Sequence, residues 1–185
     1  MKRSVGLVVM TMIPQGVDNC RVLAAVLQRR GSFNHEKMCP ESYPGCLQVI
    51  CHGKLKGDEP VEVGLVRELT EELGKAFTTA YVHGFHGEIL VESRDEEKEI
   101  VTFGALMPIE IIRDTVRLGP DSGGLVYVTI DQINDQRIVF ELGSGAPGSV
   151  FDMIKTYGPI KTNTIAMFPD EIEAVKKAFK VFGEE

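Results

Sequence analysis

GKLKGDEPVEVGLVRELTEELGK, residues 53–75, is the stretch of this sequence that decides the fold. Its second half predicts a helix over residues 59–73, because Leu65, Leu69 and Leu73 recur at intervals of four and give the helix one apolar side. An apolar side of this kind must be buried against another element. The helix is therefore expected to lie on a core that the rest of the chain builds.

The two ends of this helix are also marked in the sequence. Asp58 is expected to cap the first turn, and Pro60 stands where a missing N–H costs nothing. Gly74 follows the last apolar residue as a stop signal. The loop of residues 53–58 enters the helix, so backbone N–H groups and the positive end of the helix dipole lie close to the carboxylates that follow.

Three carboxylates share one side of the predicted helix. Glu68, Glu71 and Glu72 lie three and four residues apart, and each like-charged pair at that spacing costs an isolated helix roughly 0.2 to 0.5 kcal/mol. A cation between them would remove this repulsion, and hard divalent cations such as Mg²⁺ take oxygen ligands of this kind. The alternative is a solvated acidic surface in which Arg67 pairs with Glu71.

The whole stretch resembles the Nudix box, whose pattern is Gly, five residues, Glu, seven residues, then Arg-Glu-apolar-x-Glu-Glu-x-Gly-apolar. The matching residues are Gly53, Glu59, Arg67, Glu68, Leu69, Glu71, Glu72 and Gly74. One position departs from the pattern, because Lys75 stands where the family prefers an aliphatic residue. So many residue types at fixed spacing make a specific signal.

The resemblance implies a loop, helix and loop that hold catalytic Mg²⁺ or Mn²⁺ while water attacks phosphorus. Glu68, Glu71 and Glu72 would be the metal ligands, Arg67 would orient a glutamate, and Glu59 would support the loop. Bridging metal ions of this kind neutralise phosphate charge and activate the nucleophile.

The general base stays open. Glu68 is the first choice from inside the box. In some family members the base or a further ligand comes from a later loop, and Asp121 and Glu110 stand in that region here. Acidic residues also punctuate ordinary loops, so either residue can equally belong to a turn or to the surface.

Substrate contacts are expected from the variable loops and the box. Gly53 and Lys54 in the box, and Arg29 and Arg30 at the start of a long polar loop, are the candidates for phosphate contacts. Gly53 and Gly57 are also expected to let the backbone turn tightly, as the family's glycines do. His52–Leu55 is similar to a variant found in sugar-nucleotide pyrophosphatases, which favours a substrate like ADP-ribose or a sugar nucleotide.

The remaining chain alternates between strand and helix signals. Strands are predicted over residues 5–11, 22–28, 46–51, 78–91, 99–106 and 125–129, and helices over 130–136, 149–156 and 170–182. Residues 29–45 and 108–124 are predicted as long loops. The expected fold is α+β, a Nudix-type α/β/α sandwich with a mixed sheet. Residues 1–145 would form the Nudix domain, with 146–185 a C-terminal helical extension packed on it.

Composition excludes several classes of protein. The chain has 185 residues and a net charge of −7, which argues against a nucleic-acid surface because such a surface needs clustered basic residues. No apolar stretch approaches the roughly 20 residues that span a bilayer, so no membrane association is expected. The apolar run 5–13 lacks a cleavage signal and is interpreted as a first strand. A cytoplasmic location follows.

The cysteines form no familiar metal-binding pattern. Cys39, Cys46, Cys51 and His52 lie close in sequence, but their spacing matches no standard zinc site. Reduced thiols are the expectation for a protein with this few cysteines.

The predicted function is a metal-dependent hydrolase that cleaves a phosphoanhydride bond of a small nucleotide, a nucleoside diphosphate linked to another moiety. The alternative from another class is a Nudix-fold module that binds a nucleotide without cutting it, because fold alone does not determine function. RNA-end processing by the same chemistry is a third alternative, against which the acidic balance speaks. A homodimer also stays open.

Overall fold

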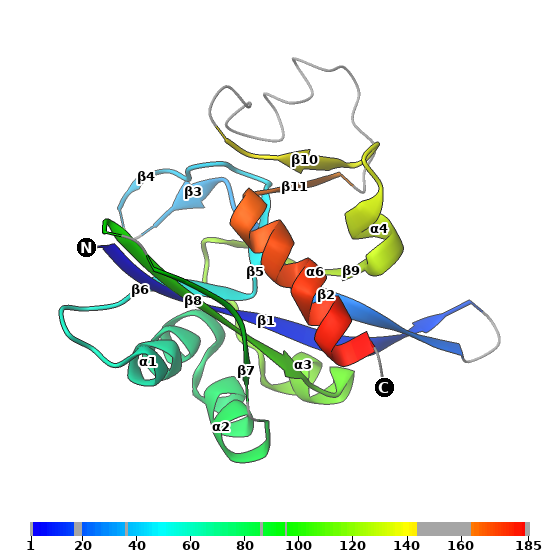
Figure 1. Cartoon of the computed structure of the whole chain (residues 1–185), viewed down its shortest axis with the longest axis horizontal. Coiled ribbons are helices and arrows are strands. Elements are labelled where there is room, and N and C mark those ends of the chain that lie inside the picture. Colours follow the sequence, from blue (N-terminus) through cyan, green and yellow to red (C-terminus); the bar gives the residue numbers. More distant parts are fainter. Residues whose placement is uncertain are drawn as a thin grey trace.

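A seven-stranded mixed sheet stands at the centre of the computed structural model of the chain (Figure 1). The structure describes residues 2–16, 20–35, 37–85, 87–94, 96–143 and 164–183. The strands of the central sheet are β1 (Lys2–Gln15), β2 (Cys20–Arg30), β5 (Leu47–Val49), β6 (Cys51–Lys54), β7 (Glu88–Arg94), β8 (Lys98–Leu106) and β9 (Ser122–Thr129). The other elements are α1 (Val61–Leu73), α2 (Lys75–Gly84), α3 (Ile109–Thr115), α4 (Ile130–Asn134), α6 (Pro169–Gly183), and the short strands β3 (Phe33–Asn34), β4 (Cys39–Pro40), β10 (Val139–Glu141) and β11 (Ile165–Met167).

Strand β1 organises the sheet. Along one edge it pairs in parallel with β8, and along the other it pairs antiparallel first with β6 and then with β2. Strand β5 pairs with β2, and only Ile50 separates it from β6. The chain therefore passes from β2 to β1 through residues 47–54, and this passage leads directly into the loop before α1.

The side chains of β1 point alternately to the two faces of the sheet, so the fold has three layers, with helices on both faces. Val5, Leu7 and Val9 share one core with α1, α2 and α3, whereas Val8 and Met10 share a second core with α6 on the other side of the sheet. Figure 1 shows the same layers, with α1 to α3 on one side of the sheet and α6 with α4 on the other. The expected α+β sandwich with a mixed sheet is thereby confirmed.

Helix α1 buries the side that its leucine spacing predicts. Leu65, Leu69 and Leu73 are all buried in the first core. Its start differs from the expectation, because the helix begins at Val61 with Pro60 as the capping residue and no side-chain cap, so the prediction that Asp58 caps it is wrong. Pro60 instead has φ of −59° and ψ of 145°. This extended conformation, which the proline ring favours, ends the loop just before the helix.

The predicted strand over 78–91 is wrong, because helix α2 occupies its first half. Phe77 and Tyr81 lie four residues apart and are both buried in the first core, which the helical period explains and a strand would not. Gly74, with φ of 89°, breaks the chain direction between α1 and α2. Tertiary packing thus outweighs the strand preference of these threonines and aromatics.

Two predicted loops contain short elements. The segment 108–124 includes α3, which starts after Pro108 and buries Ile112, so the prediction of a continuous loop there is wrong. The segment 29–45 holds the small β3–β4 hairpin, and β2 itself continues to Arg30. Both corrections shorten the irregular segments that face the box.

The last described helix, α6, confirms the helix predicted over 170–182. Its buried residues Ile172, Val175 and Phe179 lie in the second core. Strands β10 and β11 pair in parallel just before it. The helix predicted over 149–156, and the domain boundary at residue 146, lie outside the described residues. Among the helices that the structure describes, none combines the length and apolar character needed to cross a bilayer.

Candidate active site

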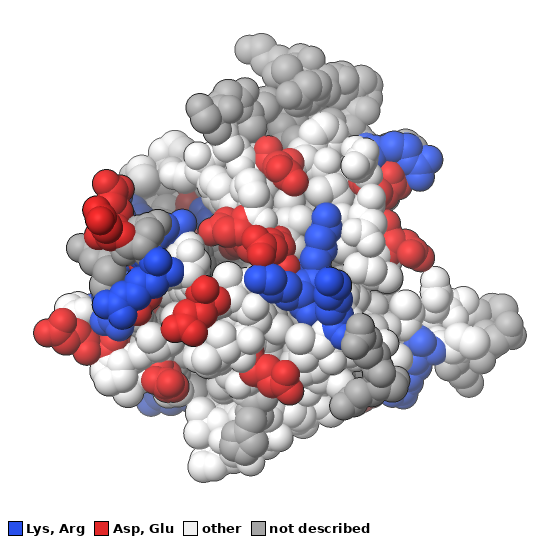
Figure 2. Space-filling model, in the orientation of Figure 1, with Lys and Arg blue, Asp and Glu red and all other residues white. Residues whose placement is uncertain are grey.

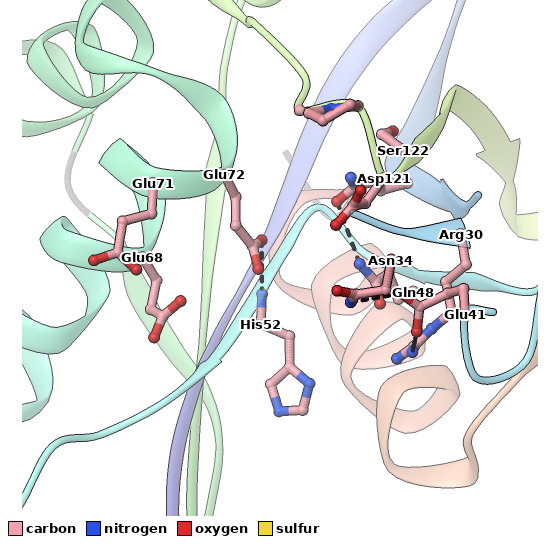
Figure 3. A pocket seen from close by; sticks show the side chains of 13 residues that line it. Arg30, Asn34, Glu41, Gln48, His52, Glu68, Glu71, Glu72, Asp121 and Ser122 are labelled. Carbon is pink, nitrogen blue, oxygen red and sulfur yellow. Dashed lines mark hydrogen bonds and ion pairs between the residues drawn. The ribbon is translucent and has the colours of Figure 1, made fainter. Parts of the chain in front are cut away.

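The box helix faces a cavity of about 450 Å³ on the edge of the sheet. Figure 3 shows the α1 glutamates on one wall and residues of the β2–β5 region and the loop before β9 on the opposite wall. The lining residues are Gln28, Arg30, Asn34, Glu41, Gln48, His52, Glu68, Glu71, Glu72, Gly119, Pro120, Asp121 and Ser122. All three glutamates that the box resemblance implies as metal ligands therefore meet one cavity.

Glu68 lies over the backbone of Gly53. The side chain is only 8% exposed, and a Cβ added at Gly53 would stand 1.8 Å from the Glu68 carboxyl carbon. Gly53 belongs to β6 and lacks a positive φ, so the expected tight turn there is wrong. The glycine is required because any side chain would displace the Glu68 carboxylate, whereas Gly57, with φ of 54°, makes the turn.

Arg67 links the carboxylates of the box. Its Nε and Nη2 donate to the two oxygens of Glu59 at 3.0 and 2.8 Å, and its Nη1 donates to Glu68 at 2.6 Å and to Glu71 at 3.2 Å. Nη2 also donates to the carbonyl of Lys54 at 2.9 Å. These hydrogen bonds from Arg67 hold the pKa of Glu59 at about 2. Arg67 thus positions two of the three cavity glutamates and the loop before the helix.

Glu72 has different surroundings. Its carboxylate accepts the backbone N–H of His52 at 3.4 Å and has no ion pair with a described residue. Burial raises the pKa of Glu72 to about 7, and the negative charge of Glu68 adds to the rise. Burial also raises the pKa of the neighbouring Cys51 thiol. The cluster therefore holds more negative charge than its protein partners neutralise.

The chemistry of this donor set fits a hard divalent cation. The cavity wall presents carboxylate oxygens from three residues, and oxygen ligands with incomplete neutralisation are what Mg²⁺ and Mn²⁺ prefer. Within the described residues, no three His, Cys, Asp or Glu side chains already converge on one point. Arg67 explains this, because it holds Glu68 and Glu71 in the orientation of an ion pair.

Asp121 faces the glutamates from the opposite wall. It accepts the backbone N–H of His35 at 2.9 Å and also contacts the His35 ring, and these bonds lower the pKa of Asp121. Its own carbonyl accepts the N–H of Gly31 at 2.8 Å, which joins the loop to the end of β2. Glu110, the other later acid, lines separate cavities with Met12. The structure thus brings Asp121 but not Glu110 to the box.

Of the three basic residues predicted to contact phosphate, only Arg30 lines the cavity. Arg30 lines the cavity and lies 3.6 Å from Glu41, whereas the guanidinium of Arg29 donates to the carbonyl of Gly45. Adjacent residues of a strand point to opposite faces, which accounts for the difference. Lys54 supports Arg67 through its carbonyl and is not among the cavity-lining residues.

Several cavity residues escape recognition from sequence. Gln28, Gln48 and His52 line the wall, and only the first carries a usable signal, because it lies two residues before Arg30 and so on the same strand face. The cysteines are dispersed: Cys39 is exposed on β4, and Cys46 and Cys51 are buried.

Charge on the visible face is mixed. Figure 2 shows short groups of Lys and Arg beside acidic groups, without a continuous basic stripe on that face. A continuous stripe is the footprint that nucleic-acid binding usually requires.

Comparison with family models found no match, and comparison with curated proteins found none either. Solved structures do match. A mutT/nudix family protein from Listeria innocua has a TM-score of 0.59 at 15% identity, over 99% of this chain and 94% of that one. An Ap4A hydrolase from C. elegans has a TM-score of 0.53 at 12% identity, over 100% of both chains.

A third likeness is to a MutT/nudix family protein from Enterococcus faecalis, with a TM-score of 0.52 at 14% identity, over 100% of this chain and 62% of that one. All three likenesses extend over at least 99% of this chain. At such identities a likeness establishes the fold. The chain therefore has the Nudix fold.

Proposed function

We propose that this chain is a divalent-metal-dependent hydrolase that cleaves a phosphoanhydride bond in a nucleoside diphosphate linked to another moiety. One observation carries the proposal: Glu68, Glu71 and Glu72 line one cavity from α1 while Arg30 lines the opposite wall. Carboxylates on one side suit a metal ion, and a guanidinium on the other suits phosphate oxygens. The cavity thus offers carboxylates to a cation, and Arg30, which lies 3.6 Å from Glu41, as the one guanidinium of the described lining for phosphate.

Glu68, Glu71 and Glu72 would hold the cation, Mg²⁺ or Mn²⁺. When bound, it would neutralise phosphate charge and make the attacking water more acidic. Arg67 bonds one oxygen of Glu68 and one of Glu71, so the other oxygen of each would be available to the cation, while Glu59 keeps the guanidinium in place through two hydrogen bonds.

In the reaction, a water oxygen forms a bond to phosphorus, the anhydride P–O bond breaks, and the water proton passes to a carboxylate. Glu68 is the base we favour, because it is buried at the centre of the box. Asp121 is the alternative from the opposite wall, but its lowered pKa makes it the weaker acceptor. Arg30 would orient the phosphates.

We favour an ADP-ribose-like or sugar-nucleotide-like substrate. The His52–Leu55 segment supports this preference by its similarity to sugar-nucleotide pyrophosphatases. The solved relative from C. elegans is an Ap4A hydrolase, so a diadenosine polyphosphate belongs in the same comparison. A small nucleotide fits a cavity of about 450 Å³, which lies within the usual range for ligand sites.

Release of a nucleoside monophosphate from ADP-ribose, Ap4A, NADH, a sugar nucleotide and nucleoside triphosphates, with Mg²⁺ or Mn²⁺ and detected by chromatography, tests the proposal. The Glu72→Gln variant should lose at least about 100-fold in kcat, because it removes one proposed metal ligand. Glu62→Gln is the matched control, since Glu62 is exposed in the first turn of the same helix and lies outside the cavity. Equal turnover by the Glu72→Gln variant would contradict the ligand assignment.

A module that binds a nucleotide without hydrolysis gives a different result in the same assay. It would release no nucleoside monophosphate from any substrate, yet calorimetry would still detect nucleotide binding. Turnover by the wild type that requires added metal and is lost in the Glu72→Gln variant supports the hydrolase instead.

A further inference from the structure

A second cavity, of about 260 Å³, adjoins the box cavity. His52 lines both, and Figure 3 shows its ring pointing away from Glu72. The second cavity is also lined by Val49, Val91, Ser93, Lys98, Ile100, Thr102, Asp170, Glu171 and Glu173. Its size is below that of a typical drug-sized site, so it suits one ring system.

Glu171, in the first turn of α6, is the unusual residue of this second cavity. It is 7% exposed, and its Oε1 accepts the N–H of Val49 at a long 3.4 Å. Its other oxygen, Oε2, is buried and has no hydrogen-bond partner among the described residues. A buried polar atom without a partner is costly, which points to a ligand that supplies one.

The neighbouring charges leave this carboxyl without an ion pair in the described part of the chain. Lys98 lies 3.8 Å from Asp170, and Arg30 lies 3.6 Å from Glu41. Burial raises the pKa of Glu171 to about 7. The charge of Arg30 and the backbone N–H groups of Val49 and Phe168 oppose the rise, and the charge of Asp170 adds to it. The neutral carboxyl therefore persists to near neutral pH, and it presents one donor beside one acceptor.

We propose that Glu171 recognises an adenine-type base edge, with Oε2–H donating to the ring nitrogen and Oε1 accepting from the exocyclic amino group. This inference rests on the proposed function, and it names the nucleoside that occupies the second cavity while the diphosphate lies in the box cavity. Adenine shares this edge with cytosine, whereas hypoxanthine and guanine carry an N–H at the same ring position and would need the carboxyl proton on Oε1, the oxygen that accepts from Val49. Val49, Val91 and Ile100 supply apolar surface for the ring.

A helix-capping role is the competing explanation of Glu171. An acidic residue in a first turn stabilises the helix dipole, and the hydrogen bond from the backbone N–H of Phe168 to the Glu171 carboxyl is consistent with this role. Capping predicts an effect on stability alone. Base recognition predicts in addition a change in the preference between two nucleotides that differ only at the base edge.

Binding of ADP and IDP to the full chain, measured by calorimetry at pH 6 without turnover, tests the proposal. Wild type should bind ADP about tenfold more tightly than IDP, the factor expected for one mismatched hydrogen-bonding edge. Glu171→Leu should bind both equally, whereas Glu171→Gln should keep the preference, because a neutral amide also offers a donor beside an acceptor. Glu62→Gln, far from the second cavity, should behave as wild type.

The pH dependence provides a second measurement should the leucine variant fold poorly. Between pH 6 and 8 the ADP-to-IDP affinity ratio of wild type should fall as Glu171 ionises, and that of Glu171→Gln should stay constant. Titration of the phosphates affects the affinities of ADP and IDP equally, so it does not change their ratio. The other charged or titratable groups that face Glu171 are Asp170 and Glu173 on α6, Lys98 on β8, His52 on β6 and Arg30 on β2.

Equal affinities of wild type for ADP and IDP, tighter binding of IDP, absence of binding, or an unchanged preference in Glu171→Leu would each overturn the inference. None of these results affects the hydrolase proposal, which depends on metal-dependent turnover and its loss in Glu72→Gln. Conversely, a failure of turnover with an intact preference for ADP would overturn the hydrolase and leave the base site standing.

Discussion

Two neighbouring cavities surround their carboxyl groups differently. In the box cavity, Glu68 and Glu71 share the Arg67 guanidinium, whereas Glu72 has no ion pair among the described residues. In the second cavity, Glu171 is buried beside apolar residues, with no cation paired to it among those described. Under the two proposals, the carboxylates of the box cavity would hold a cation, whereas the Glu171 carboxyl would recognise a base edge. The Arg67 guanidinium between Glu68 and Glu71 has no counterpart beside Glu171 in the described part of the chain, and the predictions below test this difference.

Loss of Arg67 should break the first cavity most severely. Arg67→Ala removes four hydrogen bonds to three glutamates, so kcat should fall by about 100-fold, as expected when catalytic groups are misplaced by about 1 Å. Steady-state kinetics with saturating Mg²⁺ measures this. Arg137→Ala is the control, because Arg137 forms a similar two-bond pair with Asp135 on the surface. A kcat within twofold of wild type would show that Arg67 does not orient the glutamates.

The ionisation of Glu171 should make the free energy of unfolding depend on pH. Its folded pKa of about 7 exceeds the ordinary value of 4.5, so the folded chain binds the proton more tightly and wild-type stability falls as pH rises from about 4.5 to 7. Glu171→Gln does not titrate, and its stability relative to wild type should rise by about 3 kcal/mol over that window. Urea unfolding from pH 4 to 8 measures the difference. A constant difference would mean that Glu171 ionises normally, and Glu62→Gln serves as control.

At Gly53, the space left by the missing side chain should affect kcat more than backbone flexibility does. Gly53→Ala would push its Cβ into the Glu68 carboxylate, with an expected cost of about 1–3 kcal/mol and a loss of about tenfold or more in kcat. Gly57→Ala is the matched variant, because no atom lies within 4 Å and only the positive φ is strained, at about 1 kcal/mol. Thermal unfolding together with kinetics separates the two. Equal losses of kcat would show that the box loop needs flexibility at both glycines.

The smallest expected effect is the difference in KM between alanine variants of two adjacent arginines. Arg30→Ala should raise KM for the nucleotide about tenfold, the value of one charge-assisted hydrogen bond, because Arg30 lines the box cavity. Arg29→Ala should leave KM nearly unchanged, since its guanidinium is bound to the Gly45 carbonyl. Initial-rate kinetics on both variants checks this, and a larger KM effect at Arg29 would reverse the assignment.

Sequence alone predicts the box well because its contacts are local. Glu59, Arg67 and Glu68 lie within one loop and one helix, so spacing along the chain is nearly spacing in space. Helix α2 is missed because its threonines and aromatics favour strands locally, and only burial of Phe77 against the first core decides the outcome.

The second cavity shows where sequence reasoning stops. Glu171 meets the N–H of Val49 across 122 positions of the chain, and nothing in its neighbourhood distinguishes it from a solvated first-turn acid. Asp121 and Glu110 have equal standing in sequence, yet only the former reaches the box cavity. Such choices depend on which segments the sheet brings together.

The segment that passes from β2 to β1 fixes the distance between two backbone N–H groups, one in each cavity. Val49 donates its N–H to Glu171, and His52, three residues later, donates its N–H to Glu72. At about 3.3 Å per extended residue, these two anchoring points are at most about 10 Å apart along the chain. If base and phosphate bind as proposed, this segment would set the distance between the base site and the scissile phosphate, and nucleotides with longer or shorter linkers would be cut at a different bond or not at all.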